Sequence, residues 1–422
     1  MLRNKLAIGV FCLSLGLLFL SGCNRSTVTE ATAAKTGFAP LQLSAEGVDA
    51  AEPVTATAPD GNFYVAWVNH DVKNQADVMI GRFDSQGTMR GAPVRVNPQP
   101  GVATAWRGDQ PSVAVAGNGT VYVVWTARVE ADGKKGTDLY LSVSNDMGQT
   151  FAAPVKINDD KVPGAHGMHS LGIAGDGRIY VSWLDERNVH VPKPSTKAEG
   201  HHMESNRELF IAYSTDGGRT FSKNQKIAAE ACPCCKTALA VAADGTLYIG
   251  WRHVLPGNYR HIAVTSSTDA GATFSAPVIV SDDKWVLQGC PVSGPSLSVN
   301  DAGVLKVLWY AAGEANAPGL YFAESKDKGR SFSQGQLLAK ETVRGTPVLA
   351  ASSGADVAIW ETSGGASAET RLRKVANEAP SITLGWNAEL PAAAFSKDGL
   401  FVAYVSKVKE KRSVWMVKAD QR

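Results

Sequence analysis

The sequence is poor in cysteine and nearly balanced in charge. Six of its 422 residues are cysteines, and 42 Lys and Arg stand against 40 Asp and Glu, which gives a net charge of +2. The chain has no basic block and no acidic tail. A protein that binds nucleic acid through its phosphates needs clustered Lys and Arg, so we expect no nucleic-acid partner.

The N-terminus holds an apolar run, AIGVFCLSLGLLFL, that is too short for a comfortable transmembrane helix. Arg3 and Lys5 precede this run, and the segment ends in Leu20-Ser21-Gly22-Cys23. This pattern resembles the bacterial lipoprotein signal, in which cleavage precedes the cysteine and a lipid is attached to its sulfur. We expect a signal peptide over residues 1–22 and lipidation of Cys23, with an uncleaved membrane anchor as the alternative.

Asn24, not an aspartate, follows the lipidated cysteine. By analogy with lipoprotein sorting in enteric bacteria, this favours the outer over the inner membrane. We therefore expect a lipid-anchored protein of the bacterial cell envelope, with its folded part in the periplasm or at the cell surface. Residues 23–37 are rich in Thr and Ala without an apolar period and predict a lipidated tether. The folded domain is expected at 38–422.

Four short segments share one pattern. Each has Ser, then Asp two residues later, Gly two after that, Ser or Thr two further on, and Phe. The segments are SNDMGQTF (144–151), STDGGRTF (214–221), STDAGATF (267–274) and SKDKGRSF (325–332). The aspartate can bond its own turn, and the glycine tolerates a positive φ. The pattern resembles the Asp-box (BNR) repeat of sialidase-like β-propellers, and this resemblance implies an all-β propeller.

A second repeat is interleaved with the Asp-boxes: an alternating apolar strand, an Asp/Asn-Gly-type turn, and a strand that ends in an aromatic residue. The copies end at Trp67, Trp125, Trp183, Trp251, Trp309, Trp360 and Tyr404. Together the repeats predict four-stranded antiparallel blades A-B-C-D with the Asp-box in the C–D turn. We count seven blades, with six as the alternative. Residues 39–44 supply the strand that the last blade lacks, which predicts closure of the ring by the N-terminal strand.

The D–A and B–C loops of such a meander emerge on one face, which we call the loop face, and the Asp-box turns on the other. All eight histidines map to the loop face, as do the four cysteines after the lipidation site. The histidines are His70, His166, His169, His190, His201, His202, His253 and His261. Either they belong to a binding site at the mouth of the central channel, or this face has longer loops that collect polar residues.

After removal of the signal peptide and lipidation of Cys23, the candidate thiols are Cys232, Cys234, Cys235 and Cys290. In an oxidising compartment they are expected as disulfides or as metal ligands. In the first interpretation, two disulfides tie blades 4 and 5 through a bridge such as Cys235–Cys290, while a bridge within CPCC is constrained. In the second, the thiolates hold a soft metal, copper or zinc. A free, reactive thiol is the third interpretation.

Imidazole and thioether groups would complete such a metal site. The candidate ligands are His166, Met168, His169, His201, His202 and His253. His201, His202 and Met203 lie in the longest B–C loop, residues 184–208, an insertion of the kind that often forms a lid. These three residues either bring ligands to a metal or are solvated loop residues.

The resemblance to sialidases also implies a catalytic alternative. Sialidases clamp the substrate carboxylate with three arginines, whose planar fork binds a carboxylate bidentately. They also use a Tyr nucleophile activated by Glu, and an Asp acid/base. Candidates on the loop face are Arg107, Arg252, Arg344, Tyr259, Asp185 and Glu314. The Phe/Tyr-Arg-Ile-Pro segment of sialidases is absent, and the repeats specify the fold and not the reaction.

Binding is therefore our leading hypothesis for function. We expect the loop face to bind a soft metal ion, a glycan or other small ligand, or a protein partner, while the lipid anchor attaches the chain to a membrane. An exo-sialidase or related glycoside hydrolase, with an arginine-lined pocket on the same face, is the alternative.

Overall fold

The computed structural model describes residues 39–71, 75–161, 163–189, 205–287, 289–364, 367–376, 380–408 and 411–419. The chain divides into two units, Met1–Thr32 and Ala33–Arg422, and all the described residues lie in the second. They form 29 strands and no helix, which confirms the all-β prediction. Accordingly, no membrane-spanning helix occurs among them.

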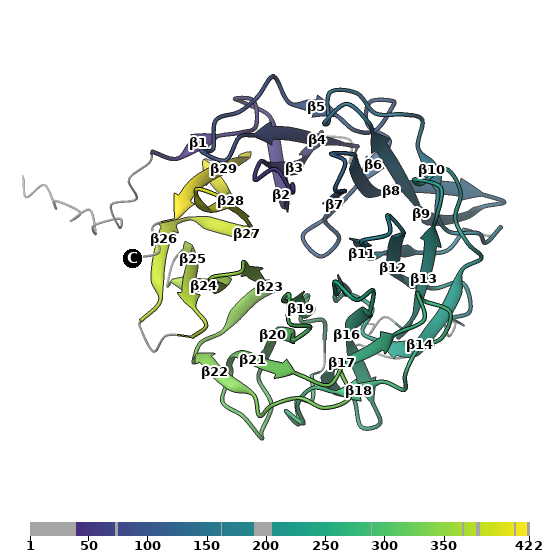
Figure 1. Ribbon diagram of the computed structural model, residues 1–422, viewed down its shortest axis with the longest axis vertical. Helices are drawn as coiled ribbons and strands as arrows, with labels where there is room; N and C mark the ends of the chain where they lie inside the picture. Colours follow the sequence, from purple (N-terminus) through teal and green to yellow (C-terminus); the bar gives the residue numbers. More distant parts are fainter. Residues whose placement is uncertain are drawn as a thin grey trace, which may run out of the picture. The chain divides into compact units, whose positions relative to one another are not determined.

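The strands form seven antiparallel blades around a common centre (Figure 1). Three sheets have four strands and hold one blade each, while the nine-stranded and eight-stranded sheets hold two each. Short bridges through β6 (Ala103–Thr104) and between Ala231 and His253 join the blades in the two larger sheets. The seven-blade prediction is therefore confirmed for the described residues, and the innermost strand of each blade faces the centre.

The strands of blade 1 are β2 (Asp49–Thr57), β3 (Phe63–His70), β4 (Ala76–Phe83) and β5 (Val94–Arg95). Those of blade 2 are β7 (Ser112–Val115), β8 (Val121–Ala131), β9 (Lys134–Ser144) and β10 (Val155–Lys156). Those of blade 3 are β11 (His166–Ile173), β12 (Ile179–Asp185), β13 (Arg207–Ser214) and β14 (Gln225–Ala231). Those of blade 4 are β15 (Ala238–Val241), β16 (Leu247–Leu255), β17 (Tyr259–Ser267) and β18 (Val278–Ile279).

The strands of blade 5 are β19 (Ser296–Val299), β20 (Leu305–Ala311), β21 (Gly319–Ser325) and β22 (Gln336–Ala339). Those of blade 6 are β23 (Val343–Ala351), β24 (Asp356–Gly364), β25 (Ser367–Lys374) and β26 (Ile382–Trp386). Those of blade 7 are β27 (Ala388–Ser396), β28 (Gly399–Val408), β29 (Lys411–Ala419) and, from the start of the domain, β1 (Leu41–Gln42).

The N-terminal strand closes the ring, as predicted. Leu41 pairs antiparallel with Met416, and Gln42 pairs with Trp415. The amide of Val414 also donates to Ser44 Oγ over 3.1 Å. This pairing covers the outer edge of blade 7, so that the last blade also has four strands.

Two tryptophans of the B strands, Trp309 and Trp360, tie neighbouring blades together. Trp309 and Trp360 are fully buried. Their indole N–H groups donate over 2.9 Å to Asp283 and Glu341, which follow the outermost strand of the preceding blade. A buried indole N–H needs such a partner. Each of these tryptophans therefore both packs the core and fixes the position of the neighbouring blade.

The Asp-boxes lie in the C–D turns, on the face opposite the loop face. In blade 3, Ser214 Oγ donates to Asp216 Oδ1 over 2.7 Å and accepts the Gly218 amide over 2.9 Å. The Thr220 amide and hydroxyl donate to the two oxygens of Asp216 over 3.0 and 2.6 Å. The same four bonds recur in the other three copies. The closing phenylalanines pack on the cores.

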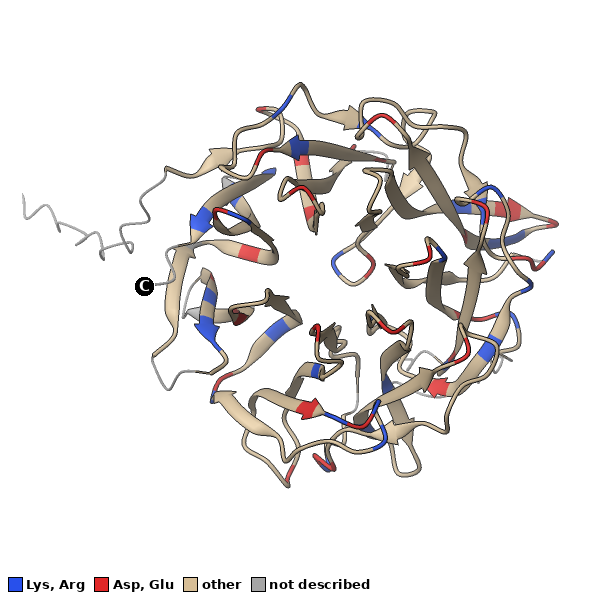
Figure 2. Ribbon diagram, viewed as in Figure 1, with Lys and Arg blue, Asp and Glu red and all other residues tan. Residues whose placement is uncertain are grey.

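The segment between β6 and β7 projects over the centre of the ring (Figure 1). Trp106 and Asp109 form its tip, where the Asp109 amide donates to the Trp106 carbonyl over 2.8 Å. Acidic and basic residues are interspersed around the ring and do not gather on one side of it (Figure 2). This mixture matches the near-zero net charge of the sequence.

Candidate functional site

The cysteine-rich stretch forms a tight turn just before β15. Pro233 occupies the second position of the turn, where its fixed φ is favourable. The Cys235 amide donates to the Cys232 carbonyl over 3.4 Å. This turn brings its first and last residues together, so that the Sγ atoms of Cys232 and Cys235 lie 3.4 Å apart. Both side chains are buried. The C-x-x-C spacing inside CPCC therefore builds a buried thiol pair.

Cys234, the third residue of the turn, is disulfide-bonded to Cys290, with the two Cα atoms 6.2 Å apart. The bridge ties blade 4 to the segment before blade 5, but it uses Cys234 and not the predicted Cys235. The reason is that the turn directs Cys235 toward Cys232. These two remain free thiols, so the described residues hold one disulfide beside one thiol pair. We call these four residues the cysteine cluster.

Two buried arginines lie beside the thiol pair. Arg260 Nη1 donates to Cys232 Sγ over 3.1 Å, and the Cys232 amide donates to the carbonyl of Arg252 over 2.8 Å. The hydrogen bond from Cys235 outweighs burial and, with the charge of Arg260, lowers the pKa of Cys232 to about 6. Burial raises the pKa of Cys235 well above its usual value. The site therefore favours a thiolate on Cys232.

Arg252, a catalytic candidate, is fully buried. Its three nitrogens donate to the carbonyls of Ser293, Arg260 and Tyr310 over 2.8, 3.1 and 2.9 Å. Its guanidinium also lies over the ring of Trp285, 4.8 Å from the ring centre. In this conformation it is not open to a substrate carboxylate.

Arg107 and Arg344, the other two arginine candidates, meet at Glu361. Arg107 Nη2 lies 2.7 Å from Glu361 Oε2, and Arg344 Nε lies 3.4 Å from Oε1. Glu361 is buried in β24 and also accepts the Leu390 amide over 2.9 Å. Burial raises the pKa of Glu361, although the Arg107 charge opposes this rise. Because Arg107 belongs to the segment over the centre, the ion pair crosses the channel mouth to blade 6.

Asp109, from the same central segment, links blade 2 to blades 3 and 4. It accepts the amide of Met168, which adopts a positive φ of 55° at a bulge in β11, over 2.6 Å. His169 Nε2 lies 3.9 Å from Asp109 Oδ1, and Lys236 Nζ donates to the Gln110 carbonyl over 2.6 Å. Burial raises the pKa of Asp109, lowers that of His169 well below its usual value, and lowers that of Lys236 to about 8. The Met168 side chain packs in the same apolar cluster as the three neighbouring cysteines.

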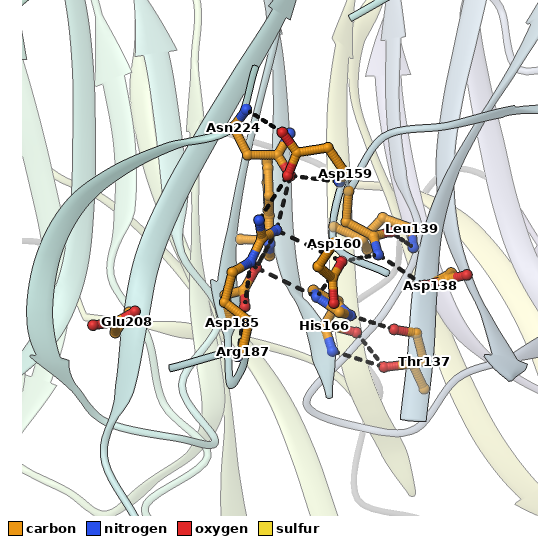
Figure 3. Close-up of polar contacts among 12 residues, drawn as sticks. Thr137, Asp138, Leu139, Asp159, Asp160, His166, Asp185, Arg187, Glu208 and Asn224 are labelled. Atoms are coloured by element: carbon orange, nitrogen blue, oxygen red, sulfur yellow. Dashed lines mark hydrogen bonds and ion pairs between the residues drawn. The ribbon is translucent and has the colours of Figure 1, made fainter. Parts of the chain in front are cut away.

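His166 lies among carboxylates at the junction of blades 2 and 3 (Figure 3). Its Nε2 is 3.3 Å from Asp160 Oδ1 and 3.4 Å from Asp185 Oδ2, and its Nδ1 contacts the Thr137 carbonyl over 2.5 Å. Burial lowers the pKa of His166, but the close contact with Asp160 and the charges of Asp185 and Asp160 outweigh it and raise the pKa. The arrangement therefore favours a buried imidazolium.

One ligand atom each from Asp138, Asp160 and His166 lies within 4.8 Å of the other two, which is close enough to hold a cation. However, positive side chains already neutralise these carboxylates. Lys156 Nζ lies 2.9 Å from Asp138 Oδ2, and Arg187 Nη2 lies 3.7 Å from Asp160 Oδ1. Arg187 Nη2 also lies 2.9 Å from Asp185 Oδ2. Asp185, another catalytic candidate, is fully buried in this network. The cluster thus joins two blades through balanced ion pairs.

The remaining candidates lie apart from one another or outside the described residues. Tyr259 begins β17 and is 37% exposed, with its ring tilted against that of His261 at 6.0 Å. Glu314 is exposed between β20 and β21. His253 pairs with His261 across β16 and β17, and burial lowers its pKa. Cys23, His201, His202 and Met203 lie outside the described residues.

The likenesses to solved structures concern the fold. A PL25 ulvan lyase shares 12% identity with this chain at a TM-score of 0.59, covering 90% of this chain and 96% of the lyase. A protein of unknown function from Dyadobacter fermentans shares 15% identity at a TM-score of 0.51, and the match covers 90% of this chain and 98% of that protein. The Hadza microbial sialidase Hz136 shares 14% identity at a TM-score of 0.50, and the match covers 84% of this chain and 76% of the sialidase. At these identities the likeness shows the fold alone. No curated protein sequence matches the chain.

Residues 61–342, more than half of the chain, match the BNR repeat-like domain family. The protein belongs to this family, and it is a BNR-repeat β-propeller of the sialidase-like superfamily. All four Asp-boxes on which the sequence resemblance rests lie inside the matched segment, and they adopt one geometry. The family and the fold are therefore fixed, while the chemistry depends on the loop face.

Proposed function

We propose that this protein is a soft-metal-binding propeller of the bacterial cell envelope, which holds copper(I), or else zinc, between Cys232 and Cys235 on its loop face. The observation that carries the proposal is a buried thiol pair with 3.4 Å between its sulfurs, beside two buried arginines. Thiolates are the protein ligands that copper(I) and zinc prefer.

The charges around the pair support a bound thiolate complex. Within the described part of the chain, neither Arg252 nor Arg260 forms an ion pair with a carboxylate, although both are buried. A buried cation is costly unless an anion compensates it. Two thiolates around copper(I) carry one net negative charge, whereas two around zinc(II) carry none. The buried arginines therefore favour the anionic copper(I) complex over the zinc complex.

The cell envelope, the compartment that we propose, also favours a bound metal. The N-terminal sequence supports cleavage before Cys23 and a lipid on its sulfur. A lipid there would attach the propeller to a membrane of the cell envelope, and we propose the outer membrane in preference to the inner. In an oxidising compartment, two thiols this close would form a disulfide unless a bound metal shields them. Mass spectrometry of the N-terminal peptide tests the anchor: a diacylglyceryl group on Cys23 is expected, and an unmodified peptide that begins at Met1 would contradict it.

Competitive copper(I) titration tests the proposed metal site. The mature domain from Asn24 is titrated against bicinchoninate, with ascorbate to keep copper reduced. We expect about one tightly bound equivalent, and a loss of at least about 100-fold in affinity in Cys232→Ser and in Cys235→Ser, because ligand loss should exceed the effect of an outer-shell change. Met147→Leu removes an exposed thioether on the opposite face and serves as the control. Unchanged affinity in both cysteine variants would refute the proposal.

Glycan binding is a second candidate function for the same face. Trp106 is 44% exposed at the tip of the central segment, next to the ion pair of Arg107 with Glu361. An exposed aromatic ring beside charged groups suits an anionic sugar. Two proteins with the same fold, the ulvan lyase and the sialidase, have names that indicate such substrates. Binding of sialosides and uronate-containing oligosaccharides by the protein, and its loss in Trp106→Ala, tests this candidate. No binding to either ligand would exclude it.

A further inference from the structure

We infer that the Cys234–Cys290 disulfide is a redox gate on the metal site: its reduction by a dithiol releases Cys234 as a third sulfur ligand beside Cys232 and Cys235. This inference rests on the proposed metal-binding function and adds a regulation to it. The bridged protein offers two sulfurs to a soft metal, and the reduced protein offers three.

The distances among the sulfurs carry the inference. The Sγ atoms of Cys232, Cys234 and Cys235 all lie within 4.8 Å of one another. Cys232 Sγ is 3.9 Å from Cys234 Sγ and 3.4 Å from Cys235 Sγ. Three sulfurs bound at about 2.3 Å to one metal ion in a plane lie about 4.0 Å apart. The turn therefore already holds the three sulfurs near the spacing of a trigonal metal site. Only the bond from Cys234 to Cys290 prevents the third sulfur from binding the metal.

The surroundings of the three sulfurs suit such a site. All three cysteine side chains are buried, in one apolar cluster that also contains Met168. An apolar shell excludes water and competing hard ligands from a thiolate site. Three thiolates around copper(I) carry two negative charges, and two buried guanidinium groups, those of Arg252 and Arg260, stand nearby to balance them. The copper(I) complex of three thiolates therefore balances both guanidinium charges, whereas the complex of two thiolates balances only one of them.

The disulfide can be reached from one side. Cys290 is exposed, while Cys234 is 4% exposed. A thiolate of an envelope dithiol reductant attacks Cys290 Sγ, and Cys234 leaves as a thiolate. The second thiol of the reductant then attacks the mixed disulfide and releases Cys290, so that the reductant becomes a disulfide and both cysteines are reduced. The exposed end thus receives the reductant, and the buried end becomes the ligand.

Two matched variants separate the gate from the site itself. Cys290→Ser leaves Cys234 without a partner and should create the three-sulfur site without a reductant. Cys234→Ser removes the third sulfur but keeps the thiol pair. Wild-type protein is prepared with the bridge intact, and again after treatment with a phosphine reductant that is removed without air. Thiol titration of the denatured domain should give about two thiols in the first form and about four in the second. All forms are titrated with copper(I) against bicinchoninate, with ascorbate, which leaves disulfides intact.

We expect reduced wild type and Cys290→Ser to bind copper(I) at least about tenfold more tightly than bridged wild type, since even outer-shell changes shift metal affinity by that much. Cys234→Ser should show no gain on reduction. Equal affinity in bridged and reduced wild type would overturn the gate while leaving the proposed function standing. No copper binding in any form would refute the proposed function itself. The comparison of the two wild-type forms stands even if a variant fails to fold.

Discussion

Arg260 Nη1 donates a hydrogen bond to Cys232 Sγ over 3.1 Å, and both side chains are buried. The guanidinium charge helps to lower the pKa of Cys232 to about 6. Replacing Arg260 by Gln should therefore raise the pKa of this thiol toward about 8.5, its usual value. The ultraviolet absorbance of the thiolate as a function of pH measures this change.

A matched control is available on the opposite face, where Arg219 is an exposed Asp-box residue. Arg219→Gln should leave the thiolate titration unchanged. The same Arg260→Gln variant should bind copper(I) more weakly, because a buried positive charge no longer balances the complex. An unchanged thiolate titration in Arg260→Gln would contradict the role assigned to this arginine.

The ion pair across the channel mouth should matter for stability. Arg107→Gln leaves the buried carboxylate of Glu361 with the Leu390 amide and, as its ion pair, only the weaker contact to Arg344. It should lower the free energy of unfolding by about 1–3 kcal/mol. Arg344 is 47% exposed and its contact is 3.4 Å, so Arg344→Gln should cost less. Urea unfolding of both variants measures the difference. The double variant Arg107→Gln/Glu361→Gln should recover part of the loss, and a larger loss in it would contradict the account.

His166 and His169 should give opposite pH dependences of stability, although they lie three residues apart. The folded pKa of His166 is raised, so its contribution is fully present below about pH 6.5 and is lost as the pH rises through the folded pKa. The folded pKa of His169 is lowered, so its contribution is present above about pH 6.5 and is lost as the pH falls.

Unfolding in urea at several pH values checks both signs. His166→Gln should remove a fall in stability as the pH rises above about 6.5, and His169→Gln should remove a fall as the pH drops below about 6.5. The adjacent Asp160 has a lowered pKa, so its own contribution is lost only at much lower pH. Identical pH profiles for the wild type and both variants would show that neither imidazole has the assigned protonation state.

Arg252 should behave as a structural residue and not as a substrate clamp. Arg252→Gln removes charged hydrogen bonds to three buried carbonyls and should lower the free energy of unfolding by roughly 3 kcal/mol or more. Thermal unfolding measures this loss. A variant with wild-type stability would contradict the role inferred here and would return Arg252 to the list of ligand-binding candidates.

Much of the fold could be predicted because it repeats. Each Asp-box encodes its own turn through local bonds, and the alternating strands before each tryptophan encode the hairpins. The closing strand, Leu41–Gln42, was predictable because the last blade lacked its outer strand. Local sequence patterns therefore predicted the blades, and counting the hairpins predicted that there are seven of them.

The site was predictable in place but not in contacts. The topology predicts that the cysteines open the innermost strands of blades 4 and 5, and they lie shortly before β15 and β19. Only the Pro233 turn, however, decides that Cys235 faces Cys232 and leaves Cys234 for Cys290. The ion pair of Arg107 with Glu361 joins residues 254 positions apart, and no local pattern encodes that contact. The one available signal was the C-x-x-C spacing with Pro at its second position, which is typical of a turn that pairs its two end cysteines.

The central claim is that the thiol pair binds a soft metal, and elemental analysis of the purified domain tests it most directly. The domain from Asn24 is isolated without a histidine tag from copper- and zinc-supplemented periplasm, alongside the Cys232→Ser/Cys235→Ser variant. The account predicts about one equivalent of copper, or of zinc, in the wild type and almost none in the variant. Equal metal content in the two proteins, or none in either, would contradict it.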